Sequence, residues 1–150
     1  MTEALHTITV RRLIRARRES VFDAFSRSEA LTQWFSPSPD ISVEVLAFEF
    51  APEGRFRLRY TMPDGVQPVV GGVYQEIARP DQLVFSWIWE PPYPHADVQT
   101  RVLIRFVDKG DATEVVLTHD RLPSEEAGIH HSEGWNGIFD RLSRIFPETQ

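Results

Sequence analysis

A glutamate, two histidines and a tyrosine are the side chains most able to do chemistry in this sequence. Glu76 lies two positions after Tyr74 in a predicted strand, His119 lies in the last predicted strand, and His131 opens the C-terminal helix. If these strand faces line a cavity, an acid, an imidazole and a phenol can bind a polar ligand group or transfer protons. A hydrogen-bonded structural network of the same residues is the alternative. The sequence therefore leaves catalysis open and assigns no catalytic residue.

The sequence lacks the motifs of disulfide, metal and phosphate-binding sites. The chain has no cysteine, which excludes disulfides and thiolate metal sites. Gly71-Gly72 lacks the spacing of a phosphate-binding loop. His130, His131 and Glu133 could suggest a metal, but only His131 lies on the apolar face of the predicted helix, and one histidine with one carboxylate cannot complete a typical zinc shell. We expect neither a metal nor a cofactor.

Length and charge limit the classes of function. The 150 residues fit one domain, expected over 1–150, and the net charge of −6 disfavours nucleic acid and anionic membranes as partners. No apolar run approaches the roughly 18 residues of a membrane span. The N-terminal arginines allow a mitochondrial presequence, but the alternation of apolar residues over 8–14 favours a strand. We therefore expect a cytoplasmic protein.

Two short helices are predicted after the first strand. Ser20 begins a capping-box-like segment with Asp23 three residues later. A second helix begins at Ser28, and residues 36–39 (SPSP) end it because proline disfavours helical geometry in the preceding residue.

Period-two alternation then predicts five or six further strands. Residues 41–50 form one, with a change of parity near Leu46 that suggests a bulge. Residues 55–62 alternate apolar side chains with three arginines, which are either a binding patch or, as we favour, the solvated face of a half-buried strand. Asp64-Gly65 predicts a hairpin. Residues 71–89 (GGVYQEIARPDQLVFSWIW) contain two predicted strands joined by a Pro-Asp turn. The second of these strands places several of the largest side chains on one face.

A long C-terminal helix closes the chain. Ser124 is its N-cap candidate, although Gly128 leaves a later start near His130 open. Trp135 begins an apolar stripe at helical spacing, and Pro147 is expected to end the helix. Gly134 beside this stripe is expected to let the helix approach its neighbour closely. One helix covers only part of so wide a sheet, so the sheet must curl around it or leave a space.

Several spaced segments carry a resemblance over roughly residues 6–146. They are VRRLIRA (10–16), VFDA (21–24), LTQWF (31–35), GVYQEI (72–77), LVFSW (83–87), 113–119 and HSEGW (131–135). Their order resembles the START-like (SRPBCC, helix-grip) superfamily, most closely its heat-shock-protein-90 ATPase activator homologue family. The resemblance implies an α+β helix-grip fold, in which a curved antiparallel sheet of about six to seven strands wraps around the C-terminal helix.

The same resemblance implies a mainly apolar cavity between sheet and helix that binds a small hydrophobic or amphipathic molecule. One alternative is a module that contacts the chaperone, although the extra N-terminal domain of the eukaryotic activators finds no room in this chain. The other is a cyclase- or hydratase-like enzyme that uses the cavity. The chain is expected to be a monomer or a homodimer. The candidate cavity residues are Trp34, Phe35, Tyr60, Tyr74, Glu76, Phe85, Trp87, Trp89, His119, His131, Trp135 and Phe139.

Overall fold

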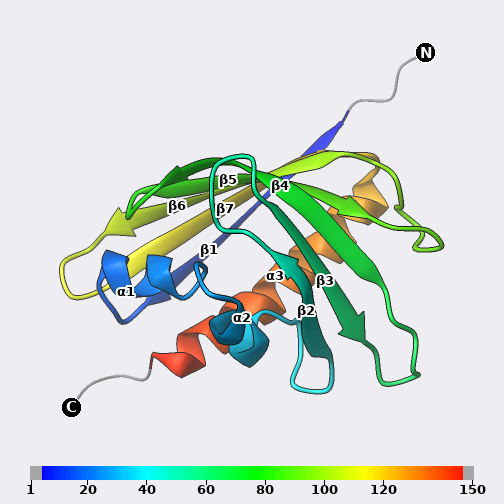
Figure 1. Ribbon diagram of the computed structural model, residues 1–150. Helices are drawn as coiled ribbons and strands as arrows, with labels where there is room; N and C mark the ends of the chain where they lie inside the picture. Colours follow the sequence, from blue (N-terminus) through cyan, green and yellow to red (C-terminus); the bar gives the residue numbers. More distant parts are fainter. Residues whose placement is uncertain (1–4, 147–150) are drawn as a thin grey trace.

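The computed structural model describes residues 5–146, which form seven strands and three helices (Figure 1). In chain order the elements are β1 (His6–Ile14), α1 (Arg18–Asp23), α2 (Ser28–Trp34), β2 (Ser42–Phe48), β3 (Arg55–Thr61), β4 (Val69–Ala78), β5 (Gln82–Trp89), β6 (Thr100–Asp108), β7 (Thr113–Leu122) and α3 (Glu125–Ile145).

The strands form one antiparallel sheet in the order β1-β7-β6-β5-β4-β3-β2. The sheet curves around α3, and α1 and α2 lie at one end of the helix (Figure 1). This confirms the predicted α+β helix-grip fold. The strand pairs follow the chain, except that β1 joins the sheet beside the last strand.

Bulges in β2 and β4 change the face of the sheet on which the following side chains lie. The register of β2 shifts between Val45 and Ala47, which confirms the bulge predicted near Leu46. A second shift, between Tyr74 and Glu76 in β4, was not predicted. Because a bulge inserts one extra residue, it reverses the faces that follow it. Tyr74 is accordingly buried, whereas Glu76 is exposed.

Helix α3 begins where the sequence predicts. The hydroxyl of Ser124 accepts a hydrogen bond from the backbone N–H of Ala127 at 3.1 Å, and the helix passes through Gly128 without interruption. Its buried stripe includes Trp135, Ile138, Phe139 and Leu142. The predicted stop at Pro147 lies outside the described residues.

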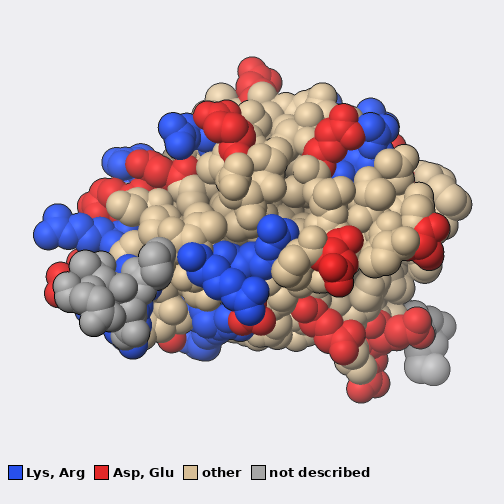
Figure 2. Space-filling view, turned by 90° about the horizontal axis from the view of Figure 1, so that it is seen from below, with Lys and Arg blue, Asp and Glu red and all other residues tan. Residues whose placement is uncertain are grey.

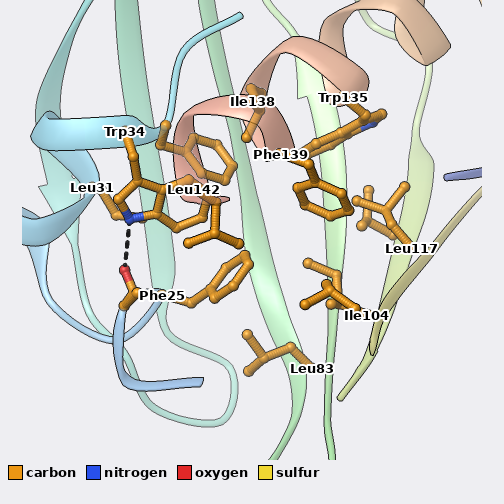
Figure 3. Packing of buried hydrophobic residues seen from close by; sticks show 14 of the residues in the cluster. Phe25, Leu31, Trp34, Leu83, Ile104, Leu117, Trp135, Ile138, Phe139 and Leu142 are labelled. Carbon is orange, nitrogen blue, oxygen red and sulfur yellow. Dashed lines mark hydrogen bonds between the residues drawn. The ribbon is translucent and has the colours of Figure 1, made fainter. Parts of the chain in front are cut away.

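The short helices fill the end of the core beside α3. The capping box expected at Ser20 is wrong, because α1 begins at Arg18 and its N-cap residue makes no side-chain hydrogen bond. The predicted start of α2 at Ser28 is confirmed. The indole of Trp34, fully buried, donates to the carbonyl of Ala24 at 3.2 Å (Figure 3).

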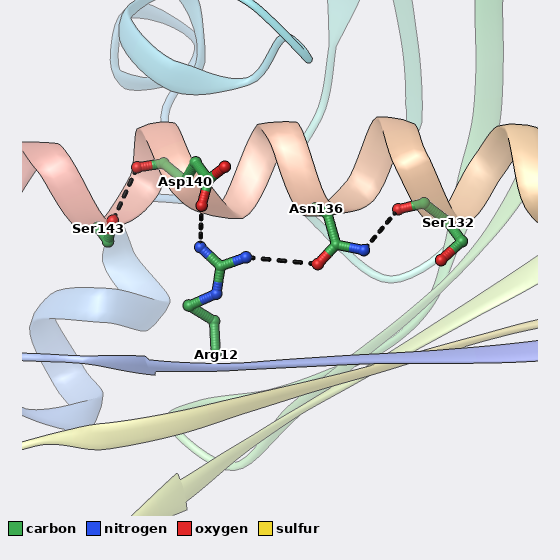
Figure 4. A network of polar contacts seen from close by, with 5 residues as sticks. All are labelled: Arg12, Ser132, Asn136, Asp140 and Ser143. Carbon is green, nitrogen blue, oxygen red and sulfur yellow. Dashed lines mark hydrogen bonds and ion pairs between the residues drawn. The ribbon is translucent and has the colours of Figure 1, made fainter.

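A polar network fixes the outer side of α3 to β1. The guanidinium of Arg12 pairs with Asp140 and donates to Asn136 at 3.3 Å (Figure 4). The amide of Asn136 in turn donates to the carbonyl of Ser132 at 2.9 Å. The middle of the helix is thus held to β1, an edge strand of the sheet, by polar contacts on its outer side.

Close approach of α3 to its neighbour occurs at Gly137, not at Gly134 as the sequence suggested. A Cβ on Gly137 would lie 2.1 Å from the carbonyl oxygen of Pro37. A Cβ on Gly134 would meet no atom of the described residues within 4 Å. Gly134 therefore leaves space open beneath the helix.

The arginines of β3 lie on the solvated face, as the favoured alternative held. Arg57 pairs with Glu90 at 2.7 Å, and Arg59 pairs with Glu44 across the β2–β3 ladder. Such exposed pairs contribute little stability each. On the face seen in Figure 2, basic and acidic side chains are interspersed, several of them next to one another, and no charge of one sign covers it.

Candidate ligand cavity between the sheet and α3

A cavity of about 90 Å³ lies between α3 and the β3–β5 side of the sheet. Most of its lining is apolar or aromatic. The lining residues are Pro37, Ile41, Tyr60, Met62, Pro68, Trp87, Trp89, Tyr93, His130, His131, Gly134, Trp135 and Ile138. No Lys, Arg, Asp or Glu of the described chain is among them.

Aromatic rings packed at tilted and edge-to-face angles build the wall. The ring centroid of Trp87 lies 5.0 Å from that of Trp135 and 5.8 Å from that of Trp89. The Tyr60 ring lies 6.2 Å from Trp89. Tilted aromatic contacts of this kind stabilise one arrangement of the rings. The cavity is therefore bounded by side chains that hold one another in place.

A wider groove continues from the cavity to the surface. Its volume is about 660 Å³, and it runs between the β3–β4 hairpin and the loop that follows β5. Met62, Pro68, Tyr93 and His130 line both spaces. A molecule longer than the cavity can therefore extend into the groove.

Tyr93 forms the rim between the two spaces. Its ring stacks on Trp89 at a centroid distance of 4.2 Å, and its hydroxyl lies 3.2 Å from the ring nitrogens of His130. Burial raises the pKa of Tyr93 to about 12. The phenol is thus neutral at ordinary pH and adds no charge to the mouth.

One tryptophan–histidine pair belongs to the cavity wall. The indole of Trp89 donates to Nε2 of His131 at 3.0 Å, and Nδ1 of His131 lies 2.7 Å from the carbonyl of Ala127. Because an indole only donates, Nε2 must be the acceptor and Nδ1 must carry the proton. The geometry therefore fixes the neutral Nδ1–H tautomer of His131.

A second such pair lies behind the wall. The indole of Trp135 donates to Nδ1 of His119 at 3.0 Å, and Nε2 of His119 lies 2.7 Å from the hydroxyl of Thr100. That hydroxyl donates to the carbonyl of Trp87 at 2.6 Å. The same reasoning gives the Nε2–H tautomer of His119, with every polar atom of the chain of bonds paired.

Both histidines are held neutral. Burial, with a smaller contribution from the nearby His131, lowers the pKa of His119 to about 3. Burial also lowers the pKa of His131 to about 4, although its hydrogen bond to Ala127 acts in the opposite direction. Protonation would place an N–H against the N–H of each indole, so the paired geometry disfavours the charged form as well.

Two buried donors of the cavity wall have no hydrogen-bond partner among residues 5–146. They are the hydroxyl of Tyr60 and Nε1 of Trp87, in side chains that are 4% and 3% exposed. Buried polar groups without partners are rare, and each costs about 1–3 kcal/mol. An acceptor from outside the protein would remove this penalty.

The structure does not bring the twelve candidate residues to one place. It brings Tyr60, Trp87, Trp89, His131 and Trp135 together at the cavity. Phe35, Tyr74 and Phe85 line a separate void of about 20 Å³ deeper in the core, and Trp87 lines both this void and the cavity. Trp34 and Phe139 are fully buried and line neither space.

Glu76 and His119 do not reach the cavity. The expectation that Glu76 shares the face of Tyr74 is wrong because of the β4 bulge, and the Glu76 carboxylate accepts from Gln82 at 2.7 Å on the exposed face. His119 is fully buried, with both ring nitrogens engaged. The acid, imidazole and phenol considered for proton transfer therefore do not converge on one open space.

Sequence reasoning missed the rim of the cavity and the role of the helical glycine that keeps it open. Tyr93 stands in a proline-rich loop, where no periodicity shows which way a side chain points. Gly134 was expected to pack closely, since a sequence does not distinguish a glycine that fits a neighbour from one that leaves room. The only signal for Tyr93 was an aromatic residue among prolines at the end of the aromatic strand.

Two further results concern metal binding and membrane-spanning helices. Within residues 5–146, no group of three or more His, Cys, Asp or Glu side chains is arranged to hold a metal ion. None of the described helices is both long enough and apolar enough to cross a membrane.

Comparison with known proteins identifies the family of the chain. Residues 15–147 match the family model described as activator of Hsp90 ATPase homolog 1-like protein. A search of curated proteins finds no significant match.

Solved structures show the same fold at low identity. A protein from Chromobacterium violaceum superposes with a TM-score of 0.85 at 18% identity, covering 95% of this chain and 98% of that one. The AHSA1 protein from Silicibacter pomeroyi gives 0.82 at 20% identity, with 93% and 96% covered. CalU16 from Micromonospora echinospora gives 0.70 at 22% identity, with 93% and 75% covered. With the family model matching most of its length, the chain belongs to the activator of Hsp90 ATPase homolog 1-like protein family and has the START-like, helix-grip fold.

Proposed function

We propose that the protein binds a small, mainly apolar molecule in the cavity between α3 and the sheet. The START-like fold supports a ligand-binding type of domain. The observation that carries the proposal is the apolar cavity itself, kept open by Gly134 and walled by aromatic rings. Apolar concave sites with a few placed polar groups are the usual form of small-molecule sites.

The size of the cavity limits what it can enclose. A cavity of about 150 Å³ is enough to hold benzene. At about 90 Å³, this cavity encloses only part of an aromatic molecule, and the remainder would lie in the adjoining groove. The proposal therefore expects a ligand with one end buried and the other end at the Tyr93 rim.

Filling the cavity from the helix tests the proposal. Gly134→Leu places its Cβ where no described atom lies within 4 Å and directs the rest of the side chain toward the cavity, and it removes a helical glycine, so folding should be retained. Acedan, a neutral naphthyl ketone whose fluorescence shifts to the blue in apolar surroundings, serves as the probe. We expect saturable one-to-one binding to the wild type and at least a tenfold weaker binding to Gly134→Leu.

The matched control places the same leucine outside the cavity. Glu133 is exposed and precedes Gly134 in α3, so Glu133→Leu should bind acedan like the wild type. Equal binding by Gly134→Leu and the wild type, or no saturable binding by the wild type, would contradict the proposal.

Chaperone contact stays an alternative prediction, favoured by the description of the family alone. It predicts that the protein stimulates the ATPase of its cognate Hsp90-type chaperone. An ATPase assay that shows no stimulation at saturating protein would remove it.

A further inference from the structure

The two unpaired donors of the cavity wall specify the chemistry of the ligand. Tyr60 and Trp87 line the cavity but not the groove, so they belong to its inner part. Both rings pack against Trp89, at 6.2 and 5.8 Å between centroids. A phenol hydroxyl can donate or accept, whereas an indole N–H can only donate. The group that satisfies both residues is an acceptor.

Trp87 stands apart from the other tryptophans of the chain. The indole N–H groups of Trp34, Trp89 and Trp135 donate to Ala24, His131 and His119, respectively. Only the indole of Trp87 lacks a partner among residues 5–146. Its neighbours are therefore paired within the protein, and the indole N–H of Trp87, a residue of the cavity wall, is the one left without a partner.

The lining also excludes a charged inner group. His131 uses both ring nitrogens within the protein and is neutral, and the exposed His130 lies at the rim. A carboxylate or an ammonium group taken into this space would have no counter-charge in the described lining, and an unpaired buried charge is strongly disfavoured. A neutral acceptor carries no such penalty.

We propose that the cavity selects a neutral, mainly apolar molecule that presents a hydrogen-bond acceptor, such as a ketone, ester or ether oxygen, to Trp87 and Tyr60. The apolar body of the ligand then lies against Trp135 and Ile138, and its outer end extends past Tyr93 into the groove. This inference rests on the proposed function, because it names the class of ligand for the same cavity.

Four probes with one aromatic ring separate the possible classes. They are acetophenone, its apolar isostere isopropylbenzene, benzoate and phenyltrimethylammonium. Isopropylbenzene leaves water more readily than acetophenone, so a purely apolar cavity would bind it more tightly. We expect acetophenone to bind at least as tightly as isopropylbenzene, and the two ions to bind at least tenfold more weakly.

The indole signal of Trp87 in ¹⁵N–¹H spectra reports the contact directly. Acetophenone should move this signal downfield, whereas isopropylbenzene should not. The signal is assigned with Trp87→Phe or, if that variant does not fold, through nuclear Overhauser contacts to the ring of Trp135. Tyr60→Phe should weaken acetophenone about fivefold, the effect of one hydrogen bond, and leave isopropylbenzene unchanged.

The outcomes distinguish this inference from the proposed function. Tighter binding of isopropylbenzene with no shift of the Trp87 signal would overturn the inference that the ligand presents a hydrogen-bond acceptor. It would still leave the cavity as a binding site for apolar molecules. Preference for phenyltrimethylammonium would overturn it in favour of cation–π binding by the aromatic wall. Failure of every probe to bind would overturn both proposals.

Discussion

The two tryptophan–histidine pairs are the most informative feature at the scale of single residues. In each pair an indole donates to a neutral imidazole, whose second nitrogen bonds to another group of the protein. The rings of His119 and His131 lie 4.9 Å apart. Two imidazoles so close together resist protonation, because each positive charge would raise the energy of the other.

These pairs predict a loss of stability in acid. Unfolded histidines take up protons near pH 6.5, whereas His119 and His131 stay neutral in the folded protein down to pH values of about 3 and 4. The unfolded state therefore binds more protons as the pH falls below 6.5. The free energy of unfolding should decrease by about 2 kcal/mol for each histidine between pH 7.5 and pH 5, measured by urea unfolding.

Single variants separate this effect from other titrations. Glutamine cannot be protonated but can still accept an indole N–H, so His131→Gln should remove about half of the pH dependence. His130→Gln, which changes an exposed ring, should retain all of it. An unchanged pH dependence in His131→Gln would contradict the neutral pair.

The unpaired hydroxyl of Tyr60 gives a second prediction at this scale. Tyr60→Phe removes a buried polar group that has no partner among the described residues, so the ligand-free protein should gain about 1 kcal/mol of stability. Tyr93→Phe is the matched control, because its hydroxyl contacts His130 and its loss should bring no gain. Thermal unfolding measures both, and destabilisation by Tyr60→Phe would mean that the hydroxyl is satisfied in the folded state.

At the scale of elements, α3 is both the support and the lid of the cavity. Gly137 lets it approach Pro37, whereas Gly134, one turn earlier, keeps the space above Trp87 and Trp89 open. The two glycines look alike in the sequence. Their opposite roles come from what lies across the interface.

This difference predicts opposite effects of one substitution. Gly134→Ala should stabilise the protein by up to about 1 kcal/mol, because alanine favours a helix and meets no described atom. Gly137→Ala should destabilise it, since its Cβ would overlap the Pro37 carbonyl and force α3 outward. Thermal unfolding of the pair checks this, and the same sign of change in both variants would contradict the packing described.

The elements themselves were largely predictable from sequence periodicity. Alternation in β3, β5 and β7 and helical spacing in α3 are strong because each element buries one face. The face of Glu76 was not predictable, because a bulge leaves alternation intact on either side of it and only the partner strand reveals the shift. The predicted start of α1 was wrong for a related reason. This helix buries Val21 and Phe22 and has no side-chain cap, so the capping pattern in the sequence did not mark its first residue.

At the scale of the whole molecule, the cavity follows from a mismatch between sheet and helix. Seven strands curve around one long helix, and α1 and α2 fill the remaining space at only one end (Figure 1). At the other end aromatic side chains of β3 and β5 form a wall beneath α3, and the β3–β4 hairpin and the loop after β5 border the opening. The location of this cavity depends on loop residues such as Tyr93, which have no periodic signal in the sequence.

The most direct test of the account is a crystal structure of the protein with para-bromoacetophenone, located by the anomalous signal of bromine. The account predicts the ring between α3 and β5, the keto oxygen within hydrogen-bond distance of Nε1 of Trp87 or the hydroxyl of Tyr60, and the bromine toward the groove beside Tyr93. A bromine signal confined to the outer surface, or an unoccupied cavity at a saturating concentration of the probe, would contradict it.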